Sequence, residues 1–108
     1  MPFYSTKSIR KIGPLLRSGK VNYWSGNECK KFEKEFSSYL GNKYSVTLSN
    51  GSVALEVALK ALNLKKGDEI IVSPRSFIIS ASCTLNLGLK PVFADVDLSS
   101  QNITPGNI

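Results

Sequence analysis

The sequence predicts an α/β fold in which helices flank a mostly parallel sheet. Helical patterns of apolar residues alternate along the chain with short runs of β-forming residues. The predicted helices are long enough for crossover connections, which join parallel strands. Three predicted strands make an incomplete sheet, and 108 residues are few for a complete cofactor enzyme. We divide the chain into an N-terminal arm, residues 1–24, and an incomplete α/β domain, residues 25–108.

The N-terminal arm contains a short amphipathic pattern. Ile9, Ile12, Leu15 and Leu16 recur at helical spacing among basic neighbours. They predict a short helix that docks on a protein surface and that Pro14 interrupts. No stretch of the sequence is long and apolar enough to cross a bilayer, so we expect no membrane partner.

The next helix is predicted to begin at a capping box. Ser25-Gly26-Asn27-Glu28 fits the S-x-x-E pattern, with Asn27 as a competing cap. Apolar residues then recur three or four positions apart, at Cys29, Phe32, Phe36, Tyr39 and Leu40. Gly41 is the expected stop, because glycine tolerates the left-handed conformation that ends many helices.

The rest of the chain alternates between strands and helices. Residues 44–48 alternate apolar with polar side chains and predict a short strand, followed by a helix that begins within residues 49–52. A turn is expected over 63–68. The run 69–72 is continuously apolar after its first residue and predicts a strand buried on both faces.

A third helix and a third strand complete the predicted pattern. Residues 77–87 read as a helix that Gly88 ends, and residues 91–94 form a further apolar strand that leads to Asp95 and Asp97. These two carboxylates are a candidate metal or acid–base pair. A solvated strand end explains them as well, and we predict no metal site.

Composition excludes several classes of function. The net charge is +6, but no nucleic-acid motif accompanies the basic residues, so no nucleic-acid partner is expected. The absence of histidine from the sequence excludes Ser-His-Asp and Cys-His catalysis and histidine zinc sites within these residues. Cys29 and Cys83 have the spacing of neither a metal site nor a disulfide framework, which favours reduced cysteines and the cytoplasm.

The turn Ser49-Asn50-Gly51-Ser52 is the most informative site in the sequence. A glycine between a strand and a helix lets backbone amides face an anion at the positive helix N-terminus, so this turn could bind a phosphate. The alternative is an ordinary turn with a serine cap. Neither G-x-x-x-x-G-K-[ST] nor G-x-G-x-x-G occurs, which argues against P-loop and dinucleotide-binding proteins.

Several motifs, in order and in register from about Val21 to Ile108, resemble the DegT/DnrJ/EryC1/StrS family of pyridoxal 5'-phosphate (PLP) dependent sugar aminotransferases. The matching segments are Phe32-Glu33, Ser49-Asn50-Gly51-Ser52-Val53-Ala54-Leu55, Gly67-Asp68-Glu69-Ile70-Ile71-Val72, Ser76-Phe77 and Gly88-Leu89-Lys90-Pro91-Val92-Phe93-Ala94-Asp95. The resemblance implies the N-terminal portion of the large domain of a type I-like PLP enzyme.

The resemblance also implies a cofactor site. The cofactor is PLP, whose phosphate binds backbone amides around Gly51, Ser52 and Val53; serine replaces the family's usual threonine at 52. Phe77 matches the aromatic residue that stacks on the pyridine ring. Its alternative interpretation is the first core residue of a helix.

The resemblance implies transfer of an amino group from an amino acid, commonly glutamate, to a nucleotide-linked keto-sugar in polysaccharide or sugar biosynthesis, by a homodimer. The family's Schiff-base lysine and pyridine-nitrogen acid lie beyond the matched segment, so no residue of this chain is a catalytic candidate and we expect no turnover from it alone. Two alternatives stay open. One is a PLP-dependent sugar dehydratase of the same family, with histidine in place of the lysine, and the other is a non-catalytic α/β binding or assembly module.

Overall fold

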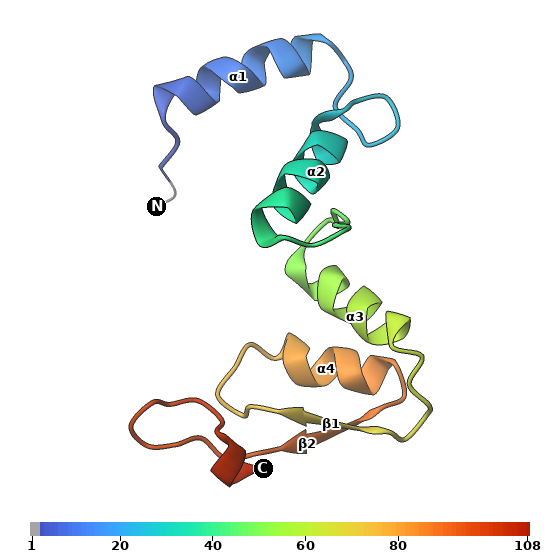
Figure 1. The fold of residues 1–108 in the computed structure, drawn as a ribbon, viewed down its shortest axis with the longest axis vertical. Coiled ribbons are helices and arrows are strands. Elements are labelled where there is room, and N and C mark those ends of the chain that lie inside the picture. The colour runs from blue at the N-terminus through green and yellow to red at the C-terminus, as the bar shows by residue number, and fades with distance from the viewer. Residues whose placement is uncertain (1–2) are drawn as a thin grey trace. The chain divides into compact units, whose positions relative to one another are not determined.

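A computed structural model describes residues 3–108. Contacts along the chain group it into two units, Met1–Thr47 and Leu48–Ile108, which we describe separately. The first contains helices α1 and α2, and the second contains α3, β1, α4, β2 and a final 3-10 turn, Pro105–Asn107 (Figure 1). None of the helices within residues 3–108 has the length and apolar character that crossing a bilayer requires.

Helix α1, Thr6–Arg17, runs through Pro14, so the predicted interruption is wrong. Proline removes one N–H donor but leaves its own carbonyl available, and the Pro14 carbonyl accepts from the Ser18 amide at 3.0 Å. The helix begins at Ser5, whose side chain accepts from the Ser8 amide. Ile9 and Leu16 remain exposed, so within the described residues the apolar face of this helix is not docked as expected.

The loop between α1 and α2 is organised by Asn22. Its side-chain oxygen accepts from the Trp24 amide, the Ser25 amide and the Ser25 hydroxyl at 2.9–3.0 Å, and its carbonyl accepts from the Gly26 amide. Gly26 is buried, and a Cβ at this position would collide with the carbonyl oxygens of Lys20 and Asn22. This loop therefore requires glycine at position 26.

Helix α2, Glu28–Leu40, has the predicted extent but not the predicted cap. The Ser25 amide, which would donate to the Glu28 side chain in a capping box, donates to Asn22 instead, so the box does not form. Asn27 occupies the N-cap position without a side-chain hydrogen bond. Gly41 ends the helix with φ 69°, as predicted.

Residues 44–48 are not a strand, so this prediction is wrong for the described chain. An alternating sequence becomes a strand only when a neighbouring strand supplies its hydrogen bonds, and β1 and β2 pair with each other. The segment is bonded instead through Thr47, whose amide and hydroxyl both donate to Glu33 of α2 at 2.8 Å.

The second unit contains a two-stranded parallel sheet, which confirms the predicted α/β class. Strand β1, Glu69–Val72, pairs with β2, Lys90–Phe93, in a register that matches Glu69 to Lys90 and Val72 to Phe93. Helix α4, Ile79–Asn86, packs on both strands, and α3, Gly51–Ala61, packs on α4. The crossover β1–α4–β2 is thus the unit that parallel pairing requires.

The hydrophobic core lies where α4 meets the sheet. Its buried hydrophobic members are Val72, Cys83, Leu89 and Ala94. Ile71, on the opposite face of β1, stays 45% exposed, so the expected burial of this strand on both faces is not found among the described residues. The sheet therefore has one covered face here.

The predicted turn before β1 is present. Asn63 and Gly67 have φ of 53° and 90°, and the Asp68 side chain accepts from the Lys65 amide at 2.8 Å. The Gly67 amide donates to the carbonyl of Gly88, which follows α4. This bond joins the turn that precedes β1 to the turn that precedes β2.

Candidate functional site

The turn at the start of α3 is organised by Asn50. Its backbone is extended (φ −165°, ψ 171°), its side-chain oxygen accepts from the Val53 amide at 3.0 Å, and its carbonyl accepts from the Ala54 amide at 3.0 Å. This is an N-cap, which satisfies one of the free amides of the first turn. The predicted serine cap is therefore replaced by an asparagine cap.

The two amides nearest the helix start have no such partner. Among residues 3–108, no group accepts a hydrogen bond from the backbone amide of Gly51 or of Ser52. These amides lie at the end of α3 where the helix dipole carries its partial positive charge. The turn can therefore donate two backbone hydrogen bonds to an anion.

Gly51 leaves the approach to these amides open. A Cβ at this position would meet nothing within 4 Å, and the residue has no positive φ. The fold of the described chain does not require glycine here. What glycine provides is unobstructed access to the backbone, the property that a close-approaching ligand needs.

Phe77 lies in the loop between β1 and α4 and is 71% exposed, so it is not the first core residue of a helix. Its ring borders a hollow of about 250 Å³. The other residues that line this hollow are Ser73, Pro74, Ser76, Ile78, Ser80, Ala81 and Phe93. The hollow has an aromatic wall and several hydroxyl groups, which suits a flat polar ring.

Both features belong to the same end of the second unit. In Figure 1, α3 and α4 run opposite to β1 and β2, so the N-terminal ends of the helices and the carboxyl ends of the strands lie at one end. In open parallel α/β sheets, ligands bind outside the carboxyl ends of the strands. The Asn50 turn and the Phe77 loop both occupy that end.

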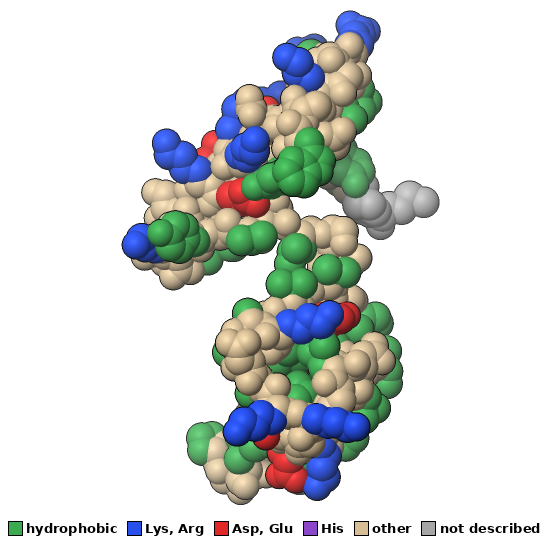
Figure 2. All heavy atoms as spheres, turned by 90° about the vertical axis from the view of Figure 1, so that its right-hand side faces the viewer, with side chains coloured by type: hydrophobic (Ala, Val, Ile, Leu, Met, Phe, Trp, Pro, Cys, Tyr) green, Lys and Arg blue, Asp and Glu red, His purple; other side chains and the backbone are tan. Residues whose placement is uncertain are grey.

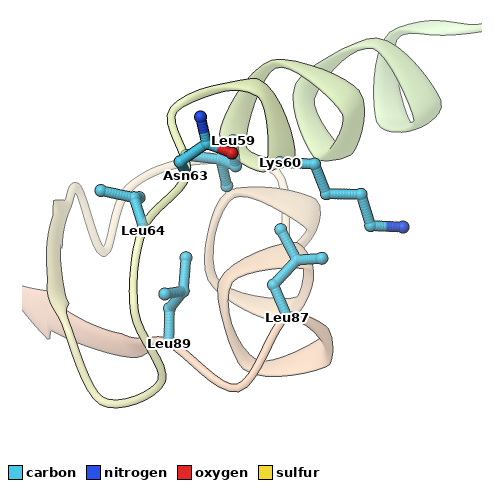
Figure 3. A pocket seen from close by; sticks show the side chains of 6 residues that line it. All are labelled: Leu59, Lys60, Asn63, Leu64, Leu87 and Leu89. Atoms are coloured by element: carbon cyan, nitrogen blue, oxygen red, sulfur yellow. The ribbon is translucent and has the colours of Figure 1, made fainter.

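A second hollow, of about 290 Å³, lies at the opposite end of this unit (Figure 3). Leu59, Leu64, Leu87 and Leu89 line it, together with Lys60 and Asn63. Lys60 is paired with Glu56 at 2.9 Å, as the i,i+4 spacing favours. The basic side chain of this lining is therefore already engaged in an ion pair.

The carboxylates after β2 form turns. Asp95 accepts from the Val96 amide at 2.7 Å, and Asp97 accepts from the Ser99 and Ser100 amides at 3.2 and 2.7 Å. The backbone hydrogen bond from Ser100 is the main reason that the pKa of Asp97 is below its ordinary value. Within residues 3–108 there is no cluster of three candidate metal ligands.

Two exposed lysines have a pKa shifted away from that of a nucleophilic amine. Hydrogen bonds to Glu28 and Glu69, each at 2.7 Å, raise the pKa of Lys31 and Lys90 respectively. A lysine that attacks a carbonyl needs a lowered pKa. These two lysines belong to surface ion pairs.

Sequence reasoning identified the turn but not the role of Asn50 within it. The signal was available, because asparagine is among the preferred N-cap residues and stands directly before the helix. Gly51, Ser52 and Val53 form the first turn of α3 as expected. The Val53 amide, however, is already bonded to Asn50.

The sequence profile of the DegT/DnrJ/EryC1/StrS aminotransferase family matches residues 4–108. The chain is 36% identical over 105 residues to the spore coat polysaccharide biosynthesis protein SpsC of Bacillus subtilis, covering 97% of this chain and 26% of that protein. It is 36% identical over 102 residues to dTDP-3-amino-3,6-dideoxy-alpha-D-galactopyranose transaminase of Aneurinibacillus thermoaerophilus, covering 94% and 28%. The chain thus spans about a quarter of the length of these curated relatives.

The chain also superposes on solved structures of two related enzymes. The aminotransferase from Psychrobacter cryohalolentis superposes with a TM-score of 0.93 at 45% identity, covering 98% of this chain and 27% of that one. The E. coli GDP-4-keto-6-deoxy-D-mannose-3-dehydratase with bound hydrated PLP superposes with a TM-score of 0.82 at 29% identity, covering 96% and 28%. The fold of the chain is therefore that of the corresponding part of PLP enzymes.

Proposed function

Because the chain belongs to the DegT/DnrJ/EryC1/StrS aminotransferase family, whose cofactor is PLP, we propose that its α3 turn is the phosphate site of a sugar aminotransferase. The reaction would transfer an amino group from an amino acid, commonly glutamate, to a nucleotide-linked keto-sugar. Under this proposal residues 1–24 are an arm and residues 25–108 are part of the PLP-binding domain of a homodimeric enzyme. The pair of unpartnered amides at Gly51 and Ser52 is the observation on which it depends.

The residues present fit the cofactor. A phosphate dianion accepts hydrogen bonds, and the turn offers the Gly51 amide, the Ser52 amide and the Ser52 hydroxyl at the positive end of α3. Phe77 offers an exposed aromatic face for the pyridine ring. When bound, the cofactor supplies the electron sink for transamination.

Val53 has a different part in the site from that of its two neighbours. Its amide donates to Asn50, so in the described conformation it supports the cap and leaves phosphate contact to Gly51 and Ser52. The cap fixes the direction of the first turn, which preorganises the free amides for an anion. Val53 would reach the phosphate directly only after Asn50 had released its amide.

Titration of the chain with pyridoxine 5'-phosphate tests the phosphate site. This probe has the phosphate and ring of PLP but no aldehyde, so it does not react with surface lysines. We expect saturable binding that pyridoxine, which lacks the phosphate, does not reproduce. Equal binding of the two compounds, or no binding of either, would refute the proposed site.

Gly51→Asp separates the loss of the site from the loss of the fold. A carboxylate in the first turn is favourable for the helix dipole, so α3 should remain stable, but it repels a phosphate at the same place. We expect binding to be abolished while the urea midpoint stays at or above that of the wild type. Undiminished binding by this variant would contradict the assignment.

The dehydratase function has weaker support. The structure of that class has 29% identity with the chain, compared with 45% for the aminotransferase. Both functions would use the same phosphate turn, so probe binding does not distinguish them. Transfer of ¹⁵N from glutamate to a keto-sugar, by an enzyme that contains this segment, would; loss of a sugar hydroxyl without nitrogen transfer would favour the dehydratase.

A further inference from the structure

A carboxylate on α2 accepts hydrogen bonds from the segment that precedes the α3 turn. Glu33 Oε1 accepts from both the amide and the hydroxyl of Thr47 at 2.8 Å, and Oε2 accepts from the Tyr23 hydroxyl at 3.4 Å. Glu33 and Thr47 are both half-buried and are separated by 14 positions in the sequence. A charged acceptor strengthens such bonds roughly twofold over a neutral one.

No other hydrogen bond joins residues 43–48 to another part of the described chain. The segment has no strand partner, and the side chains of Tyr44 and Val46 are largely exposed. Glu33 therefore accepts all the hydrogen bonds that join this segment to another part of the described chain. Without that contact, the backbone of these residues would regain conformational freedom.

Thr47 is followed by only Leu48 and Ser49 before the N-cap Asn50. Each residue spans at most about 3.6 Å of chain, so restricting the Thr47 backbone also restricts the conformations of the residues that lead into the cap. A turn that is ordered beforehand loses less conformational entropy when it binds an anion.

We propose that Glu33 is a positioning residue for the phosphate turn, acting through the amide and hydroxyl of Thr47. The proposal rests on the proposed function, because it assigns Glu33 an effect on phosphate binding. The proposal assigns Glu33 no contact with the cofactor. Its role is to lower the entropy that residues 48–52 lose on binding.

Pyridoxine 5'-phosphate affinity of four variants tests this role. Glu33→Gln removes the charge, and Thr47→Val removes the hydroxyl but keeps the amide. In buffer without urea, where every variant is folded, we expect each substitution to raise the Kd for pyridoxine 5'-phosphate on the order of fivefold. Glu35→Gln, the same change at an exposed position of α2, and Thr47→Ser, which retains both donors, should bind like the wild type.

The possible results are distinct. Wild-type affinity in Glu33→Gln, with only a lower unfolding midpoint, would reduce Glu33 to a structural brace and overturn the proposal. If Glu33→Gln fails to fold, Thr47→Val gives the same test. If the wild type itself binds no probe, the proposed function fails. In that case the ¹H–¹⁵N cross-peaks of residues 48–52 in the free chain test the role of Glu33. These cross-peaks should shift in Glu33→Gln and not in Glu35→Gln. Unshifted cross-peaks in Glu33→Gln would overturn the positioning role.

Discussion

Asn50 has two roles that a substitution can separate. Its side chain caps α3, and its position next to Gly51 makes it a neighbour of the proposed phosphate. A cap contributes to helix stability, whereas the charge of the capping side chain determines whether an anion is tolerated beside it.

Asn50→Ala should lower the free energy of unfolding by about 0.5–2 kcal/mol, because the Val53 amide loses its acceptor. Asn50→Asp should keep wild-type stability, since aspartate is an equally good cap, but should weaken pyridoxine 5'-phosphate binding through repulsion. Urea unfolding and probe titration measure the two effects. Equal stability of the alanine variant and the wild type would show that the cap does not form in solution.

Phe77 provides a second contrast between stability and binding. Its ring is 71% exposed, so Phe77→Ala should change the free energy of unfolding by no more than about 0.5 kcal/mol. Loss of ring stacking should weaken pyridoxine 5'-phosphate binding about two- to tenfold. Leu98→Ala, at another highly exposed apolar position, is the matched control. A large loss of stability with unchanged affinity would return Phe77 to a packing role.

At the scale of elements, α2 and the segment 43–48 are coupled by a titratable group. Hydrogen bonds from the Thr47 amide and then its hydroxyl hold the pKa of Glu33 below its ordinary value, with smaller contributions from Tyr23 and Lys30. A carboxyl group whose folded pKa is depressed binds fewer protons than in the unfolded chain. Its stabilisation is therefore complete above the unfolded pKa, roughly 4.3, and is lost as the pH falls through the folded pKa.

The free energy of unfolding of Glu33→Gln should thus fall less on acidification than that of the wild type. The difference in urea midpoint between wild type and variant should be constant above about pH 5 and should shrink below about pH 4.3. A residual acid slope should remain in the variant, because the pKa of Asp97 is depressed in the same direction. Glu35→Gln should keep the wild-type profile; an identical profile in Glu33→Gln would exclude the Thr47 contact in solution.

Elements whose signals are local were predictable from the sequence. Gly41 ends α2 because glycine tolerates φ 69°, and the continuous β-formers of 69–72 form strand β1. The hydrogen bonds of Asn22 were not predictable in this way. The Asn22 side chain accepts from the Ser25 amide, which a capping box would bond to Glu28, and the pattern S-x-x-E does not show which of the two acceptors this amide meets.

The strand predicted for 44–48 failed for a non-local reason. Its alternation is real, but a strand needs a partner, and within the described residues Glu33 supplies the only hydrogen bonds to this segment.

Pro14 in α1 is a case in which a local signal was misleading. A residue that usually ends helices is accommodated because the carbonyl groups after it still find donors.

For the molecule as a whole, apolar burial is unevenly distributed. All buried hydrophobic side chains among residues 3–108 lie in the second unit, around α4 and the two strands. Large apolar side chains such as Trp24, Tyr39 and Phe77 are exposed, and Figure 2 shows hydrophobic groups at the surface of each unit. The α/β class and the start of α3 within residues 49–52 were predictable from sequence patterns. The extent of burial was not, because it depends on which surfaces meet.

The most direct test of the central claim is a ¹H–¹⁵N titration of the chain with pyridoxine 5'-phosphate. We predict that the amide signals of Gly51 and Ser52 shift strongly and saturate together. The Val53 signal should shift less, because the Val53 N–H stays hydrogen-bonded to the Asn50 side-chain oxygen, and Gly51→Asp should abolish all three shifts. Saturation of other amides while Gly51 and Ser52 remain unmoved would contradict the account.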